Sequence, residues 1–189
     1  MTTQKQTQIL AFVGLPGSGK STAVEYFTKN GYPKVYFGGV VLEAMREEGI
    51  EINPENETMF RVKFREEHGK DVVVNRIADQ LRNLIDAGQH RIIADGIYTW
   101  TEYKILKKAF PNELTLVAVV APRRLRYRRL AERPIRPLTA TEAYDRDTSE
   151  IENLEKGGPI AISDHYVSNK GSVEELYAKL KELQEELGF

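Results

Sequence analysis

Residues 14–21 restrict the possible folds of this chain more than any other feature. They read Gly-Leu-Pro-Gly-Ser-Gly-Lys-Ser, which fits the pattern G-x-x-x-x-G-K-[ST] without a mismatch. The apolar run at residues 9–13 is typical of a buried strand, and residues 21–30 have helical spacing that ends at Gly31. A glycine-rich loop between a buried strand and a helix predicts a phosphate-binding loop.

Each position of this loop has a mechanical role. Its glycines allow the backbone to wrap so that successive N–H groups point at a phosphate. Lys20 reaches the β- and γ-phosphates as a point charge, and the Ser21 hydroxyl is placed to ligate Mg²⁺. We therefore assign nucleotide binding to Gly14, Pro16, Gly17, Ser18, Gly19, Lys20, Ser21 and Thr22.

The composition excludes several other classes of protein. With 27 Lys and Arg against 28 Asp and Glu, the net charge is -1, which argues against general nucleic-acid affinity but leaves room for a local basic patch. The absence of cysteine excludes disulfides and thiolate zinc sites. Residues 1–8 lack an apolar signal segment, and no run approaches the roughly 20 apolar residues that cross a bilayer. We expect a cytoplasmic protein without a membrane partner.

Strand and helix patterns alternate along the chain, which predicts an α/β fold with a five-stranded parallel sheet flanked by helices. All 189 residues fit one domain. The predicted strands are 9–13, 34–37, 91–94, 114–120 and 165–167. The predicted helices are 21–30, 40–48, 55–68, 71–87, 99–110, 122–132, 139–156 and 172–187. We expect the Gly-Gly-Pro at 157–159 to act as a breaker.

Asp95 ends the third predicted strand. Ligands bind at the carboxyl ends of strands in a parallel sheet, so we expect Asp95 near Ser21 and its Mg²⁺. Gly96 would then allow a substrate to approach the backbone closely. The alternative is that Asp95 only caps the next helix.

Arginines are dense between positions 123 and 136. Arg126, Arg129 and Arg133 share one helical face at spacings of i, i+3 and i+7. Phosphoryl transfer develops charge that fixed cations stabilise, so we expect phosphate contacts from Arg129, Arg133 and, one helix later, Arg146. Solvent exposure is expected for Arg123, Arg124 and Arg128. The alternative is a solvated basic helix or an RNA-binding face.

Beyond the phosphate-binding loop, several segments follow in a characteristic order. They are Gly-Gly-Val-Val-Leu-Glu at 38–43, Ile-Ala-Asp-Gly-Ile at 93–97, Arg-Tyr-Arg-Arg-Leu at 126–130, Arg146-Asp147 followed by Glu150, and Ser-Asp-His-Tyr-Val-Ser-Asn at 163–169 before Gly171-Ser172. With them the chain resembles the adenylate kinase-like branch of P-loop kinases. More closely, it is similar to small predicted kinases called dephospho-CoA kinase-like or AAA-family ATPases. The resemblance covers residues 9 to about 187.

This resemblance implies a P-loop NTPase core like that of the nucleoside monophosphate kinases. The core would span about 8–37, 88–132 and 157–189, with a helical acceptor-binding insert at about 38–87 and a short lid at about 133–147. Arg129 and Arg133 would bracket the donor phosphates. Asn169 and Gly171 would lie beside the adenine ring, and mainly backbone groups would hydrogen-bond to the edge of this ring.

The acceptor side departs from the relatives, which usually show Asp at Gly39, Arg at Leu42 and Arg at Tyr98. Two expected cations are therefore missing, and Arg46, one turn beyond Leu42, is a candidate substitute. We assign acceptor contacts to Gly38, Arg46, Arg61, Gly96 and Tyr98. Arg61 and Arg65 alternatively form an i,i+4 ladder with Glu57.

These assignments predict a phosphotransferase that uses ATP and Mg²⁺. It would move the γ-phosphoryl group to a small phosphorylated acceptor, and a nucleoside monophosphate is the acceptor we expect. Lys20, Asp95, Arg129, Arg133 and Arg146 are the expected catalytic residues, and Ser21 and Asp95 the metal ligands. One alternative is a dephospho-CoA-like hydroxyl acceptor with Asp95 as base. Another is an ATP-dependent switch with a macromolecular partner. We expect a monomer or homodimer that does not bind nucleic acid.

Overall fold

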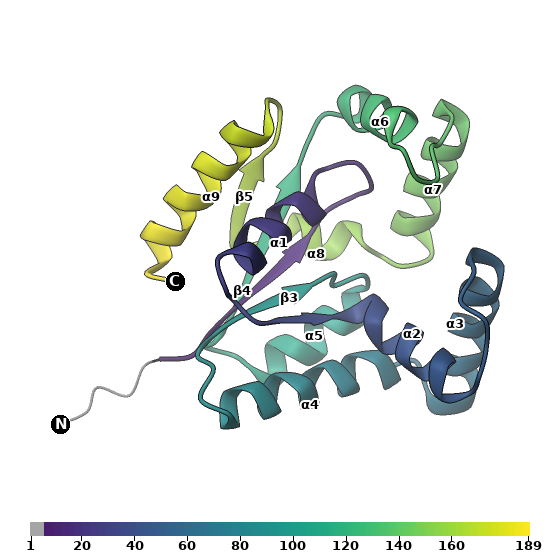
Figure 1. Cartoon of the computed structure of the whole chain (residues 1–189), viewed down its shortest axis with the longest axis horizontal. Helices are drawn as coiled ribbons and strands as arrows, with labels where there is room; N and C mark the ends of the chain where they lie inside the picture. Colours follow the sequence, from purple (N-terminus) through teal and green to yellow (C-terminus); the bar gives the residue numbers. More distant parts are fainter. Residues whose placement is uncertain (1–5) are drawn as a thin grey trace.

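The structure, a computed structural model, describes residues 6–189 and shows one sheet with helices on both faces (Figure 1). Its five strands are all parallel in the order β2-β3-β1-β4-β5, which confirms the predicted fold class. The strands are β1 (Gln8–Val13), β2 (Lys34–Tyr36), β3 (Arg91–Asp95), β4 (Leu114–Val120) and β5 (His165–Ser168). The side chains at positions 54, 55, 58, 61 and 62 lie outside the described part.

The central strand β1 is apolar because helices cover both of its faces. Leu10 and Phe12 point to one side, where they pack with Phe27 of α1 (Lys20–Lys29) and Leu180 of α9 (Val173–Leu187). The register places Phe12 beside Asp95 of β3. The phosphate-binding loop and the end of β3 therefore leave the sheet side by side.

The other face of the sheet carries the larger core. Met45, Ile77 and Leu106 are fully buried there, and they come from three helices. These helices are α2 (Phe37–Glu47), α4 (Val72–Asp86) and α5 (Trp100–Ala109). Helix α3 (Pro54–His68) adds Phe60 and Phe64 to the same core. The predicted insert thus shares one core with the sheet.

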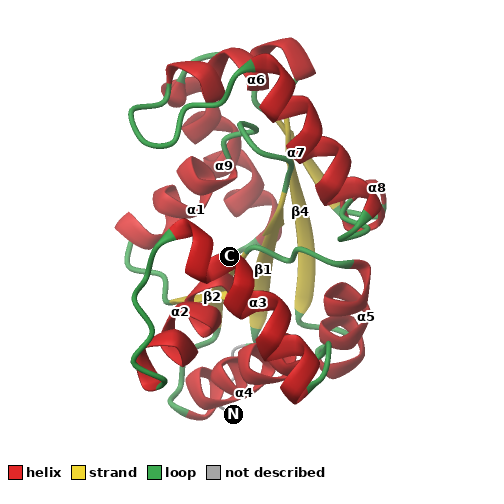
Figure 2. Ribbon diagram, turned by 90° about the vertical axis from the view of Figure 1, so that its right-hand side faces the viewer, coloured by secondary structure: helices red, strands yellow, loops and turns green. Residues whose placement is uncertain are grey.

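Two helices stand at the carboxyl end of the sheet, α6 (Arg123–Glu132) and α7 (Ala140–Glu152) (Figure 2). A buried, bidentate ion pair joins them: Arg126 donates from Nη1 to Asp147 Oδ1 at 2.9 Å and from Nη2 to Oδ2 at 2.6 Å. Arg126 also donates to the carbonyl of Pro16 at 2.9 Å. This guanidinium therefore fixes α7 to the phosphate-binding loop.

Removal of one partner of this pair is expected to be strongly destabilising. Asp147→Ala leaves a guanidinium that is 6% exposed without its charge partner, so we expect a loss of about 3–5 kcal/mol in the free energy of unfolding. Urea denaturation measures it. Asp145→Ala, at an exposed position of the same helix, is the matched control. Equal stability of the two variants would contradict this role of the pair.

Two predicted boundaries are wrong. Phe37 begins α2 and does not end β2, because Gly38 gives the Tyr36 ring room against the first turn: a Cβ there would lie 2.5 Å from Tyr36 Cζ. The helix predicted to reach residue 156 ends at Glu152, and the supposed breaker forms α8 (Gly157–Ala161). Within residues 6–189, no helix has the length and apolarity needed to cross a membrane.

Candidate active site

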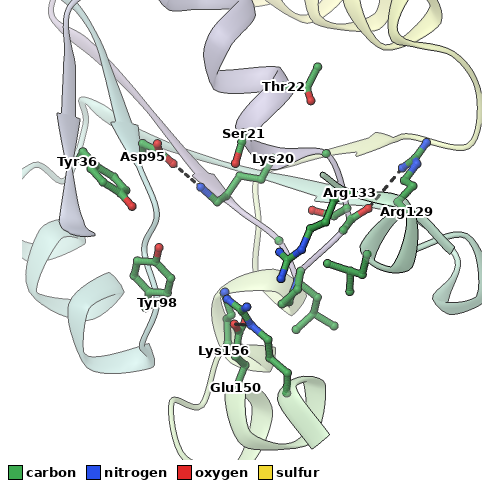
Figure 3. A pocket seen from close by; sticks show the side chains of 18 of the residues that line it. Lys20, Ser21, Thr22, Tyr36, Asp95, Tyr98, Arg129, Arg133, Glu150 and Lys156 are labelled. Carbon is green, nitrogen blue, oxygen red and sulfur yellow. Dashed lines mark hydrogen bonds and ion pairs between the residues drawn. The ribbon is translucent and has the colours of Figure 1, made fainter. Parts of the chain in front are cut away.

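A cavity of about 530 Å³ opens at the carboxyl ends of β1 and β3, and we call it the cleft (Figure 3). One wall is the phosphate-binding loop with the start of α1. The opposite wall comes from α6, α7 and the segment before α8. Its lining includes these predicted residues: Gly14, Pro16, Gly17, Ser18, Gly19, Lys20, Ser21, Thr22, Asp95, Tyr98, Arg129, Arg133 and Arg146.

The phosphate-binding loop has the backbone that its sequence predicts. Gly17 and Gly19 have φ values of 76° and 96°, which disfavour any residue with a side chain. A Cβ on Gly17 would lie 2.6 Å from the carbonyl oxygen of Arg126, and one on Gly19 would lie 2.1 Å from Asn169 Nδ2. Positions 17 and 19 therefore require glycine, and the shape of the loop fits a nucleotide phosphate.

Asp95 lies beside this loop, as predicted. Its Oδ1 pairs with Lys20 Nζ, and its Oδ2 lies 3.9 Å from Lys34 Nζ (Figure 3). It does not cap the next helix, because Thr99 accepts from Glu102 N at 2.9 Å in a complete capping box. The capping alternative is thus wrong, and Asp95 is left for the cleft.

The donor set at this position fits Mg²⁺. The described residues contain no cluster of three His, Cys, Asp or Glu side chains that would hold a metal by themselves. Mg²⁺ needs no such cage, since one or two protein oxygens and substrate phosphates suffice. Ser21, in the first turn of α1, and Asp95 supply two oxygens at the edge of the same cleft.

Arg129 joins the phosphate-binding loop to the loop after β5. Its Nη1 and Nη2 donate to Asn169 O and Oδ1 at 3.3 and 3.2 Å, and also to the carbonyls of Gly17 and Gly171. Asn169 is buried and donates to Ser18 O at 2.8 Å. The Asn169 side chain is therefore engaged with protein, so any base contact there comes from backbone groups. A side cavity of about 110 Å³ borders Arg129, Asn169 and Gly171.

Arg133 carries the clearest open hydrogen-bonding group of the cleft. Its Nε contacts the carbonyl of Arg136, whereas its Nη2 is buried without a hydrogen-bond partner. Burial, followed by the positive charges of Arg146 and Arg136, lowers the pKa of Arg133. An anion would satisfy Nη2 and relieve this repulsion, and a triphosphate is such an anion.

The sequence did not predict two buried residues of the cleft, Glu150 and Lys156. Lys156 Nζ donates to Glu150 Oε2 at 2.5 Å and lies 4.8 Å from the centre of the Tyr98 ring. Arg146 Nε donates to the other oxygen, Oε1, at 3.2 Å. Burial lowers the pKa of Lys156, and the Glu150 carboxylate opposes that shift. Lys156 is thus a buried cation on the wall of the cleft opposite the phosphate-binding loop, and Arg133 lies on the same wall.

The side of the cleft next to Asp95 has an aromatic wall. Tyr36 and Tyr98 both line the cleft and lie on the side of Asp95 (Figure 3). We expected Gly96 to leave space for a substrate, but the Tyr98 ring occupies that space. A Cβ on Gly96 would lie 3.0 Å from this ring, and the φ of Gly96 is 97°. Its role is therefore to seat the Tyr98 ring.

Several predicted candidates lie elsewhere. Arg46 is exposed on the last turn of α2 and does not line the cleft, so it is not placed to substitute for Leu42. The side chain of Arg61 lies outside the described residues. Arg65 pairs with Glu102 at 3.7 Å.

Known proteins agree with this architecture. The AAA domain family matches residues 10–152. A UPF0200 protein of Thermococcus gammatolerans is 36% identical over 182 residues, which cover 95% of each chain. The solved structure of Acinetobacter baumannii shikimate kinase in complex with shikimate has a TM-score of 0.61 at 20% identity and covers 97% of this chain and 95% of its own.

A gluconokinase from Sinorhizobium meliloti has a TM-score of 0.53 at 16% identity, over 98% of this chain and 97% of its own. These two structures show that the fold is that of P-loop kinases of the shikimate kinase type. The predicted resemblance to small P-loop kinases therefore holds at the level of the fold. From its sequence matches, the chain belongs to the UPF0200 family of AAA-domain proteins.

Proposed function

We propose that this protein transfers the γ-phosphoryl group of ATP, with Mg²⁺, to a small phosphorylated acceptor of the nucleoside monophosphate class. The charge of the cleft carries the proposal. Among the described lining residues, six are cationic and two are carboxylates. MgATP carries about two negative charges and a phosphate monoester about two more. Two polyanions bound together would neutralise the four excess positive charges.

The donor would lie along the phosphate-binding loop. The loop backbone, Lys20 and the open Nη2 of Arg133 would hold its phosphates, and Ser21 would hold Mg²⁺, which when bound neutralises developing phosphate charge. Lys20 would exchange Asp95 for the phosphates when ATP binds. Arg129 would keep the loop closed against the segment after β5.

The acceptor phosphate would lie between Lys34 and Lys156, the cations that border the two tyrosines. One of its oxygens attacks the γ-phosphorus and forms a new P–O bond. The bond from γ-phosphorus to the β–γ bridging oxygen breaks, and its electron pair leaves with ADP. The acceptor phosphate is ionised near neutral pH, so this transfer needs no general base.

A second candidate is transfer to a hydroxyl group. Asp95 favours it, because this carboxylate is 7% exposed and borders the phosphate-binding loop and the tyrosine wall. It would accept the hydroxyl proton. Two proteins that share the fold are named shikimate kinase and gluconokinase. The acceptors that these names indicate are acids with hydroxyl groups. The charge excess of the cleft favours a phosphate monoester, with about two negative charges, over such an acid, whose carboxylate carries one.

ADP formation from ATP and Mg²⁺ tests the proposal. We expect slow turnover alone and a rise of at least about 10²-fold with one nucleoside monophosphate of a panel, because the acceptor completes the charge balance. The panel includes deoxynucleotides, dephospho-CoA and gluconate. A rise with only a hydroxyl acceptor would select the second candidate. Turnover that no acceptor changes would contradict both and indicate an ATPase.

A further inference from the structure

A cavity of about 80 Å³, distinct from the one beside Arg129 and Asn169, lies next to the cleft. We call it the side pocket, and Tyr98 borders both cavities. Helices α2 to α5 and the segment after α7 enclose it. Its lining residues are Phe37, Gly38, Val41, Arg65, Val73, Tyr98, Glu102 and Leu154. The two cavities therefore adjoin at the Tyr98 side chain.

Two charged side chains face each other in this otherwise apolar pocket. The Glu102 side chain is 4% exposed and that of Arg65 is 28% exposed. Arg65 Nη2 lies 3.7 Å from Glu102 Oε1, which is too long for a hydrogen bond. Burial raises the pKa of Glu102, and the backbone N–H groups of Tyr98 and Thr99 are the main opposing influence. Glu102 is therefore buried, Arg65 is partly exposed, and no hydrogen bond joins the two side chains.

The helix cap uses only one oxygen of Glu102. Oε2 accepts from the N–H groups of Tyr98 at 2.8 Å and Thr99 at 3.1 Å, which completes the capping box of α5. A glutamine would cap equally well. The cap therefore requires neither the negative charge of Glu102 nor its second oxygen, Oε1. Buried groups of this kind are costly unless a partner completes them.

We propose that the side pocket binds the base of the acceptor and selects an aminopyrimidine, so that the acceptor is cytidine or deoxycytidine monophosphate. Oε1 of Glu102 accepts from the exocyclic amino group, as carboxylates do with cytosine. Arg65 donates to the neighbouring ring nitrogen or carbonyl. The small volume favours a pyrimidine over a purine, and the Tyr98 ring offers a stacking face. This proposal rests on the proposed function.

Uracil is the discriminating analogue. It presents a carbonyl where cytosine has its amino group, and so would place two acceptor oxygens together. A site built to bond a donor rejects an analogue without that donor strongly. We expect kcat/KM for CMP to exceed that for UMP by about 10²-fold.

Glu102→Gln is the sharpest test, because it keeps the cap and replaces the hydrogen-bond acceptor that faces the pocket with a donor. The amide oxygen is held by the two backbone N–H groups, so the NH₂ group replaces Oε1. A donor in that position suits uracil. We expect the ratio of kcat/KM for CMP to that for UMP to fall at least about tenfold, with the value for UMP itself rising. An unchanged ratio would overturn the proposal, since a purely structural role lowers both values equally.

Arg65→Met provides a second test on a partly exposed residue outside the cap. We expect KM for CMP to rise about tenfold, because one hydrogen bond is lost, while KM for ATP stays unchanged. Arg82→Met is the control, since that arginine pairs with Asp79 on the surface of α4. An unchanged KM for CMP in Arg65→Met would contradict the proposal.

Failure of this inference and failure of the proposed function give different results. If the wild-type protein phosphorylates no nucleoside monophosphate, the proposed function fails and this inference with it. If it phosphorylates CMP and UMP with equal kcat/KM, the proposed function stands and the selection by Glu102 is overturned.

Discussion

Lys20→Met is expected to remove phosphoryl transfer while the protein stays folded. Lys20 is the cation of the phosphate-binding loop, and in the proposed reaction its charge would stabilise the β- and γ-phosphates as the bond to ADP breaks. Loss of one such group from a preorganised site lowers kcat by at least about 10²-fold. Asp95 keeps Lys34 as a partner, so no buried carboxylate is left alone. Steady-state ADP release with the acceptor present measures the effect.

Lys29→Met is the matched control for this experiment. It removes the same charge from the same helix at a side chain that is 68% exposed and pairs only across the surface with Glu25. We expect its kcat and its unfolding midpoint to equal those of the wild type. Full activity of Lys20→Met would contradict the assignment of this loop to the donor phosphates.

Lys156→Met is expected to lower both stability and activity. It leaves the Glu150 carboxylate, whose side chain is 10% exposed, without its shortest partner. Breaking a buried pair costs about 3–5 kcal/mol, and Arg146 on the other oxygen of Glu150 keeps the expected loss near the lower limit, about 3 kcal/mol. Urea denaturation measures this loss. The acceptor phosphate also loses a cation, so KM for the acceptor rises.

A double variant separates the two effects of Lys156. Lys156→Met with Glu150→Gln removes both charges and keeps similar volumes, so we expect stability to recover to within about 1–2 kcal/mol of the wild type. We expect acceptor binding to stay impaired, because the cation is still missing. Recovery of the acceptor KM in the double variant would show that Lys156 serves only the fold.

The positions of the phosphate-binding loop and Asp95 were predictable because these residues are close in sequence or fixed by strand register. The loop at residues 14–21 carries its own geometry, and Asp95 follows from the rule that parallel strands end at one edge. The register of Phe12 with Asp95 places them together. The inner strands β1, β3 and β4 were predictable because each is a short, largely apolar run.

The pair of Glu150 and Lys156 was not predictable. Six residues apart on one continuous helix, they would point in different directions. They meet because α7 ends at Glu152 and Glu155 adopts a left-handed φ of 52°, which turns the chain back so that Lys156 N donates to Glu150 O at 3.1 Å. No local pattern gives this reversal.

The acceptor side shows a related limit of sequence reasoning. The resemblance implied cations at the positions of Leu42 and Tyr98, and Arg46 on the same helix as Leu42 was the expected replacement. The structure places Lys34 and Lys156 at the tyrosine wall instead, from β2 and from the segment before α8. Cations from other elements thus occupy the region, which helix spacing alone does not reveal.

If the cleft passes a phosphoryl group between two bound substrates, the label of γ-³²P ATP must reach the acceptor. The measurement separates the products after incubation with Mg²⁺ and each nucleoside monophosphate. We expect label in a nucleoside diphosphate, in amounts equal to the ADP formed and absent with Lys20→Met. Label that appears only as inorganic phosphate, at one rate with or without acceptor, would contradict it.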